Sequence, residues 1–126
     1  MFKIGLISIK DNSGCTSLGI HIANFLASES RSVTLYENKN KEEFKTVKAF
    51  FEEDGTFLLN NVRYVPSGVE KSIPSDVEIH IIGCVNFLSE FDESFDKIYL
   101  CTDASVENIP DIKEYFHETN TKADLL

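Results

Sequence analysis

The sequence predicts an α/β protein with three layers, in which helices cover both faces of a mostly parallel sheet. Three observations predict it: a nearly continuous apolar run at residues 2–9, a helical pattern directly after it, and a second apolar run at residues 32–37. Apolar runs without alternation are typical of parallel strands that are buried on both faces. A strand, a helix and a strand in succession form a unit with a right-handed crossover. We expect about four or five strands.

The first unit begins with a strand over residues 2–9, followed by a loop of turn-forming residues at 10–14. From Cys15 the apolar residues take helical spacing. The stripe comprises Leu18, Ile22, Phe25 and Leu26. This helix is expected to end at residues 28–30, before the second strand at residues 32–37.

The middle of the chain predicts a helix and a hairpin. Asn40 can cap a second helix that runs to about Glu53, and the Asp54-Gly55 pair ends it. Two short strands are expected around Asn60-Asn61. These strands are Thr56–Leu59 and Val62–Val65, and residues 66–68 close the hairpin.

Two further strands and a last helix complete the prediction. The strands are expected at residues 77–85 and 95–102, and Ser105 can cap a helix that runs to about Glu118. A chain of 126 residues accommodates one core. We therefore assign residues 1–118 to a single α/β domain and residues 119–126 to a C-terminal tail or chain end.

The distribution of charge bears on partners. The net charge is −9, and all of the excess lies in residues 64–126, because acidic and basic residues balance over residues 1–63. An acidic surface repels nucleic acid and anionic lipid, so we expect neither direct nucleic-acid binding nor membrane binding. Polar residues interrupt the first apolar run before a signal peptide or membrane span could form. The expected location is therefore cytoplasmic.

The cysteines and histidines do not predict a metal site. The three cysteines, Cys15, Cys84 and Cys101, are odd in number and show no C-x-x-C spacing, and the three histidines are scattered singly. His21 and His80 lie in apolar elements, where a structural histidine is the expected role. No metal ligands and no catalytic residues are assigned.

The candidate site is the loop between the first strand and the first helix. Ligands of open parallel sheets bind beyond the carboxyl ends of the strands, and a helix N-terminus attracts anions. The alternative is a loop that only caps the helix and makes a turn. The candidate phosphate- or nucleotide-binding residues are Lys10, Ser13, Gly14, Cys15, Thr16 and Ser17.

Residues 10–27, KDNSGCTSLGIHIANFLA, resemble the deviant Walker A segment of ParA/MinD-type P-loop ATPases, K-G-G-x-G-K-T-T-L-A and the helix after it. In this alignment Lys10 falls on the family's extra lysine, Gly14 on the last glycine and Thr16 on the magnesium-binding threonine. Residues 62–68 and 95–103 resemble later family segments, a strand ending in a proline turn and a strand facing the nucleotide. The resemblance implies a P-loop NTPase-like fold.

Departures from the family pattern bear on activity. Cys15 stands at the P-loop lysine and Asp11-Asn12 at two glycines, while Glu37-Asn38 and Gly83-Cys84 stand at two aspartate positions. A magnesium-assisted hydrolase depends on such groups. The resemblance therefore implies a non-catalytic pseudo-ATPase that acts as an interaction or regulatory module, with no cofactor.

The resemblance also implies a partner. ParA/MinD-type ATPases dimerise with this loop facing the other subunit, and Lys10 matches the lysine that crosses to its phosphates. The expected partner is a second copy of the chain or an active ATPase of the same kind. A weak ATPase that binds ATP with magnesium remains the alternative within this family.

A second resemblance is to flavodoxins, FMN-binding electron carriers. Residues 13–16 are similar to their phosphate loop, residues 77–84 resemble the strand before a flavin-flanking loop, and Phe87 could stack on the flavin. The long segment between Glu37 and Val77 fits that family less well. For Cys15, a thiolate stabilised by the helix N-terminus is the alternative to a small structural residue.

Overall fold

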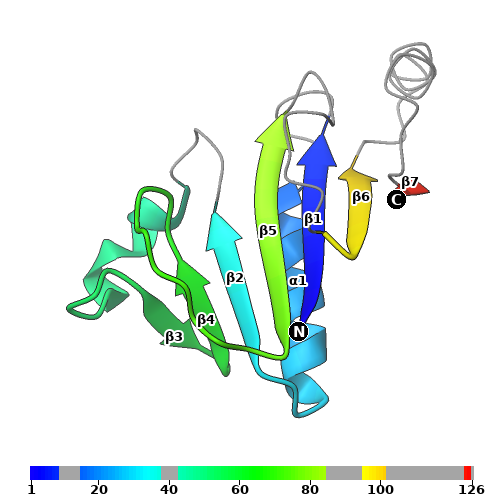
Figure 1. The fold of residues 1–126 in the computed structure, drawn as a ribbon. Coiled ribbons are helices and arrows are strands. Elements are labelled where there is room, and N and C mark those ends of the chain that lie inside the picture. Colours follow the sequence, from blue (N-terminus) through cyan, green and yellow to red (C-terminus); the bar gives the residue numbers. More distant parts are fainter. Residues whose placement is uncertain (9–14, 38–42, 85–94, 102–123, 126) are drawn as a thin grey trace.

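A seven-stranded mixed sheet with a helix packed on one face forms the centre of the structure (Figure 1). The computed structural model describes residues 1–8, 15–37, 43–84, 95–101 and 124–125. The strands are β1 (Phe2–Ser8), β2 (Val33–Glu37), β3 (Phe57–Leu59), β4 (Val62–Val65), β5 (Val77–Cys84), β6 (Lys97–Cys101) and β7 (Asp124–Leu125). The helices are α1 (Cys15–Ser28) and the 3₁₀ helix η1 (Glu43–Phe50).

The strands follow the order β3-β4-β2-β5-β1-β6-β7. Every neighbouring pair is parallel except the β3–β4 hairpin. The α/β character and the mostly parallel sheet are therefore as the sequence predicts, and the sheet has more strands than the expected four or five. The added strands are the hairpin, which joins the same sheet through β4, and β7, which lies in the segment assigned to the tail.

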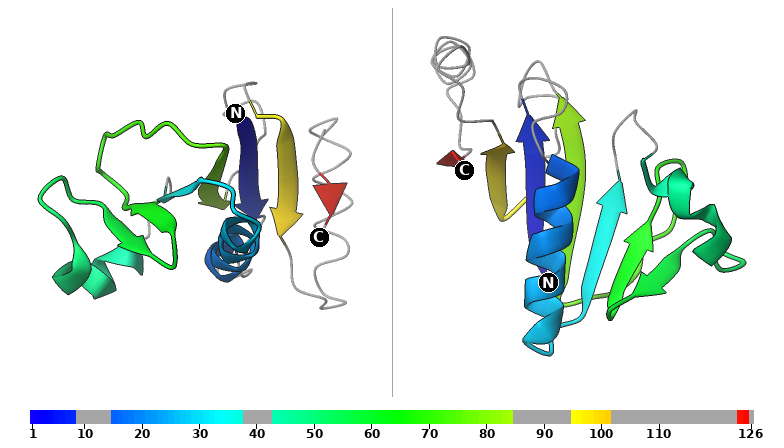
Figure 2. Two further views of the ribbon diagram at one scale, coloured as in Figure 1. Left: turned by 90° about the horizontal axis from the view of Figure 1, so that it is seen from below. Right: turned by 180° about the vertical axis from the view of Figure 1, so that it is seen from behind.

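Helix α1 covers one face of the sheet centre, behind β1 and β5 in the first view and in front of them in the reverse view (Figures 1 and 2). The helix predicted over residues 105–118 lies outside the described residues, as does the loop at 9–14. The described part of the chain therefore shows a sheet with α1 on one face, and the third layer stays a prediction.

Helix α1 packs closely because it presents small residues to the sheet. Gly19 and Ala23 are buried, and a Cβ placed on Gly19 would lie 3.1–3.2 Å from side-chain atoms of Ile81 and Leu6. At the other end of the helix, Ser30 has a positive φ of 65° and donates its amide to the Ala27 carbonyl at 3.1 Å. This left-handed residue ends α1 and returns the chain to β2.

The second predicted helix forms as a 3₁₀ helix over residues 43–50 rather than an α-helix over residues 40–53. Tertiary contacts hold both sides of this segment: the Phe44 amide donates to Glu37, and the Glu52 amide donates to the Thr56 carbonyl at 2.7 Å. A 3₁₀ helix rises about 2.0 Å per residue against about 1.5 Å for an α-helix. The 3₁₀ form is therefore the more extended way to connect the contact at Glu37 with the contact at Thr56.

Aromatic side chains attach η1 to the edge of the sheet. Phe44 contacts Tyr64 and Phe57 edge-on, with ring centroids 5.4 and 6.1 Å apart. Phe57 stacks on Tyr64 at 4.6 Å and on Phe51 at 5.4 Å. These rings belong to the same core cluster as the residues beneath α1 and extend it over the outer strands.

Two aspartates fix the amino ends of the central strands. Asp76 accepts the Ser32 amide at 3.0 Å, while its own amide donates to the Ser32 hydroxyl at 2.7 Å, which aligns β5 with β2. Asp96 accepts the Lys3 amide at 2.8 Å and donates its amide to the Lys3 carbonyl at 2.8 Å, which aligns β6 with β1. At the other end the register places Ser8 of β1 opposite Cys84 of β5 and Cys101 of β6, whereas β2 ends opposite Ile81.

Gly19→Ala tests the close approach of α1. The added methyl group meets three side-chain atoms of fully buried residues, and overpacking costs about 1–3 kcal/mol, which exceeds the gain of roughly 1 kcal/mol from helix propensity. We expect the free energy of unfolding in urea to fall by about 1 kcal/mol. The control His21→Ala, at an exposed position of the same helix, should change it by less than about 0.5 kcal/mol. A stabilised Gly19→Ala variant would contradict the packing described.

Candidate functional site

The candidate site lies at the carboxyl end of β1, where the chain leaves the sheet and enters α1 (Figure 1). Ser8 closes β1 and pairs with Cys84 of β5 on one side and with Cys101 of β6 on the other. Strand β1 is therefore central, and its carboxyl end is level with those of both neighbours. Open parallel sheets bind ligands at this edge.

Three of the six predicted site residues lie in the part of the chain that the structure describes, and three do not. Lys10, Ser13 and Gly14 lie outside the described residues. Cys15, Thr16 and Ser17 form the first turn of α1, which contains no acidic residue. The amides of a first turn have no partners within the helix and stabilise a nearby anion. Thr16 is partly buried and Ser17 is exposed.

Cys15 is turned away from this edge and into the protein. Its side chain is 5% exposed, and its thiol donates to the Ile7 carbonyl at 3.3 Å. The thiol is also hydrogen-bonded to that of Cys101, at the end of β6. In the folded structure Cys15 therefore has the surroundings of a small buried residue.

Glu37 is a buried carboxylate at the end of β2. It is 2% exposed, its Oε2 accepts the Phe44 amide at 3.1 Å, and its Oε1 accepts the Ser67 amide at 3.1 Å. Both oxygens therefore bind backbone donors, one at the start of η1 and one in the turn after β4. Buried carboxylates need such partners. From the sequence, Glu37 is noted only because Glu37-Asn38 stands at a family aspartate position. No local pattern predicts the two amides that it binds.

A carboxylate and an imidazole lie together on the sheet face opposite α1. His80 Nε2 and Glu78 Oε1, on β5, are 2.9 Å apart. The His80 ring stacks on Tyr36 with centroids 4.6 Å apart and meets the Phe95 ring edge-on at 5.3 Å. Both side chains are largely buried, and these contacts are of the kind that a structural histidine makes. The Glu-x-His spacing in a strand, which puts both residues on one face, was the signal for this pair.

Burial governs the protonation of this cluster. It lowers the pKa of His80, and the hydrogen bond and charge of Glu78 oppose that effect. It also raises the pKa of Tyr36, whose hydroxyl accepts the Ile73 amide at 3.1 Å. The favoured state at neutral pH has a neutral imidazole beside the carboxylate. The rings of Tyr36 and Phe95 lie against the imidazole.

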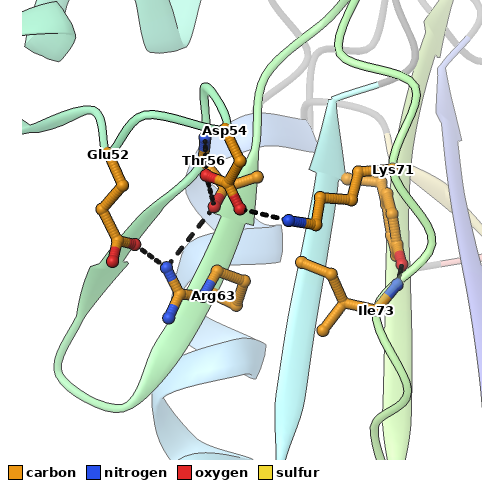
Figure 3. A network of polar contacts seen from close by, with 7 residues as sticks. Glu52, Asp54, Thr56, Arg63, Lys71 and Ile73 are labelled. Atoms are coloured by element: carbon orange, nitrogen blue, oxygen red, sulfur yellow. Dashed lines mark hydrogen bonds and ion pairs between the residues drawn. The ribbon is translucent and has the colours of Figure 1, made fainter.

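A third polar cluster joins residues 52–56, which precede the hairpin, to β4 and to the segment after it (Figure 3). Asp54 pairs with Lys71 and accepts both the amide and the hydroxyl of Thr56, at 3.0 and 2.7 Å, while Arg63 pairs with Glu52. The hydrogen bond from Lys71 is the first cause of the lowered pKa of Asp54. These charges are exposed or partly exposed and satisfy one another, which is typical of a structural surface network.

The described residues contain no group of three or more histidine, cysteine or acidic side chains placed to hold a metal ion. Within the same part of the chain, no helix has the length and apolarity that crossing a membrane requires. Comparison with protein-family models gives no match, and neither curated proteins nor solved structures give a significant match. The site is therefore interpreted from its own residues and from the resemblance that the sequence carries.

Glu37→Ala should destabilise the protein, because the amides of Phe44 and Ser67 lose their acceptors. We expect the free energy of unfolding in urea to fall by about 2–4 kcal/mol, and Glu37→Gln, which keeps one acceptor oxygen, to cost about half as much. The exposed Glu53→Ala serves as the control and should have little effect. Equal stability of Glu37→Ala and Glu53→Ala would show that the two hydrogen bonds contribute nothing.

His80 should make stability depend on pH. Because its pKa is lower in the folded protein than the usual 6.5, the unfolded chain binds more protons as the pH falls below that value. The stability contributed by the neutral imidazole is therefore lost between pH 6.5 and the lower folded value. Urea unfolding at pH 7.5 and 5 should show a smaller loss for His80→Gln, which keeps a donor for Glu78, than for the wild type. His21→Gln should follow the wild type, and a His80→Gln loss equal to that of the wild type would contradict this assignment.

Proposed function

We propose that the chain is a non-catalytic ParA/MinD-like domain that acts as a protein-interaction or regulatory module. The resemblance of residues 10–27 to the deviant Walker A segment suggests the ancestry. The observation that carries the non-catalytic role is the placement of Cys15. At the position of the P-loop lysine stands a buried side chain whose thiol bonds the Ile7 carbonyl and Cys101.

The loss of that lysine is a loss of charge. In a P-loop the ammonium neutralises the phosphates, and attraction between unit charges about 4 Å apart is roughly 4 kcal/mol near a protein surface. A buried thiol supplies no such charge. The geometry of Glu37 supports the same proposal, because both of its carboxylate oxygens already bind backbone amides. This carboxylate is therefore committed to the fold and not to a magnesium ion.

The strand order favours this proposal over a flavodoxin-like carrier. In the flavodoxin-like order 2-1-3-4-5, the second strand of the chain lies beside the first. Here β5 lies between β1 and β2, and β1 has β5 and β6 as neighbours. The segment between Glu37 and Val77, which is long for a flavodoxin, supplies η1, the hairpin and the return to β5.

The proposed partner is a second copy of this chain or an active ATPase of the same kind. This part of the proposal rests on the resemblance, in which the loop at residues 10–17 faces the partner and Lys10 reaches across. If a small anion binds there at all, it meets the first-turn amides of α1 and one lysine, opposed by Asp11. We expect millimolar rather than micromolar phosphate binding, a difference of about 4 kcal/mol.

A thermal-shift titration tests the function. MgATP, MgADP and FMN at micromolar concentrations should leave the melting temperature unchanged, and ATP hydrolysis should not exceed the rate of a Thr16→Ala variant. Cys15→Lys alone should not create hydrolysis, because the acidic positions also differ from the family. The protein should self-associate at high concentration or bind a purified ParA/MinD-type ATPase that has an intact loop.

Three results would overturn the proposal. Magnesium-dependent turnover that Thr16→Ala abolishes and Ser17→Ala retains would assign an active ATPase. Saturable micromolar binding of FMN would assign a flavin carrier. A protein that stays monomeric at high concentration and binds no ATPase of this kind would contradict the interaction module.

A further inference from the structure

Two cysteines from separate parts of the sequence meet at the carboxyl edge of the sheet. Cys15 begins α1 and Cys101 ends β6, and both belong to the buried core, at 5% and 3% exposure. Neither is in a disulfide, and their side chains meet in one core cluster, where Cys15 contacts the Ile7 carbonyl and Cys101 lies opposite Ser8, the next residue of β1. The third cysteine, Cys84, ends β5 on the other side of Ser8. Of the two cysteine side chains that the structure describes, both therefore lie at this one place in the core.

The hydrogen bonds of the pair have a direction. The Cys15 proton is directed to the Ile7 carbonyl, so the proton between the two sulfurs comes from Cys101. This hydrogen bond, followed by burial, raises the pKa of the Cys101 thiol well above its usual range. Cys15 begins a helix, whose N-terminus stabilises a thiolate. Once a local opening exposes the pair, Cys15 is therefore the thiol suited to react first, because it stands at a helix N-terminus, and Cys101 follows.

We propose that Cys15 and Cys101 form a reversible disulfide when the protein meets a small oxidant, either a peroxide or a low-molecular-weight disulfide. With hydrogen peroxide, the Cys15 thiolate attacks one oxygen, the O–O bond breaks, and a sulfenic acid and hydroxide form. Cys101 then gives up its proton, attacks the Cys15 sulfur and displaces the hydroxyl group as water. Two thiols and one peroxide thus give one disulfide and two waters, a two-electron oxidation of the pair.

A low-molecular-weight disulfide reaches the same product by exchange. The Cys15 thiolate attacks one of its sulfurs and releases one small thiol, and Cys101 then displaces the second from Cys15. Access requires only a local opening, because Cys15 and Cys101 are each the terminal residue of an element, where structure opens most easily. Once formed, the bond ties the first residue of α1 to the last residue of β6. It therefore fixes the point at which the loop at residues 9–14 enters the helix.

The experiment uses the full chain, reduced, freed of reductant and treated while folded with one equivalent of hydrogen peroxide or with oxidised glutathione. Alkylation, proteolysis and mass spectrometry should then find a peptide pair joined through Cys15 and Cys101 that dithiothreitol separates. The Cys84→Ser variant, as the matched control, should give the same product. Because the bond closes a long loop, the melting temperature of the Cys84→Ser variant should rise by roughly 5–15 °C on oxidation and return on reduction.

The melting temperatures of Cys15→Ser and Cys101→Ser should not rise on oxidation. If either variant fails to fold, the Cys84→Ser measurement tests the proposal by itself. A wild-type product linked mainly through Cys84 would overturn the proposal. A second contrary result would come from Cys84→Ser treated with oxidant. It would be a protein that keeps both thiols open to alkylation while folded but forms the disulfide when unfolded in urea. None of these readouts depends on nucleotide binding or on a partner, so they are independent of the proposed function.

Discussion

The central position of β1 is the constraint on which the rest of the structure depends. Leu6 and Ile7 are fully buried on opposite faces of this strand, so it requires a parallel partner on each side and cover on each face. Strands β5 and β6 supply the partners, and α1 supplies the cover on one face by its close approach at Gly19. The register of these strands brings their carboxyl ends level at Ser8, Cys84 and Cys101. The candidate site and the thiol pair are both consequences of that alignment.

Polar groups that the sheet buries are satisfied within the fold, and this determines which of them remain available for chemistry. Glu37 binds two backbone amides, Glu78 binds the His80 imidazole, and Tyr36 accepts a backbone amide. Each of these groups would otherwise cost several kcal/mol of desolvation. Burial and a hydrogen bond alone therefore do not make a pair such as Glu78 and His80 a functional site. Here the aromatic rings of Tyr36 and Phe95 fill the space beside the imidazole.

Much of the element order follows from the sequence, because period and turn chemistry are local. The strand–helix–strand unit, the hairpin at Asn60-Asn61, whose positive φ values match the turn, and the strands at residues 77 and 97 were all predictable. The insertion of β5 between β1 and β2 was not, since no local pattern encodes which strands pair. The 3₁₀ form of η1 was equally out of reach, because its ends are held by Glu37 and Thr56. Of the candidate site, the sequence located the first turn of α1 but not the contact of Cys15 with Cys101, which joins distant segments.

The orientation of Cys15 links the proposed loss of catalysis to the proposed thiol chemistry. A P-loop lysine extends from the first turn of its helix toward the phosphates, whereas Cys15 points back to β1 and β6 and bonds the Ile7 carbonyl. A lysine at this position would have to leave that buried place, because an unpaired ammonium in an apolar core carries a large desolvation cost. The difference from an active P-loop is thus a local repacking in addition to a change of one side chain. In the proposed domain, Cys15 stands where an ATPase has its phosphate-binding lysine, and it contacts the sheet instead of a phosphate.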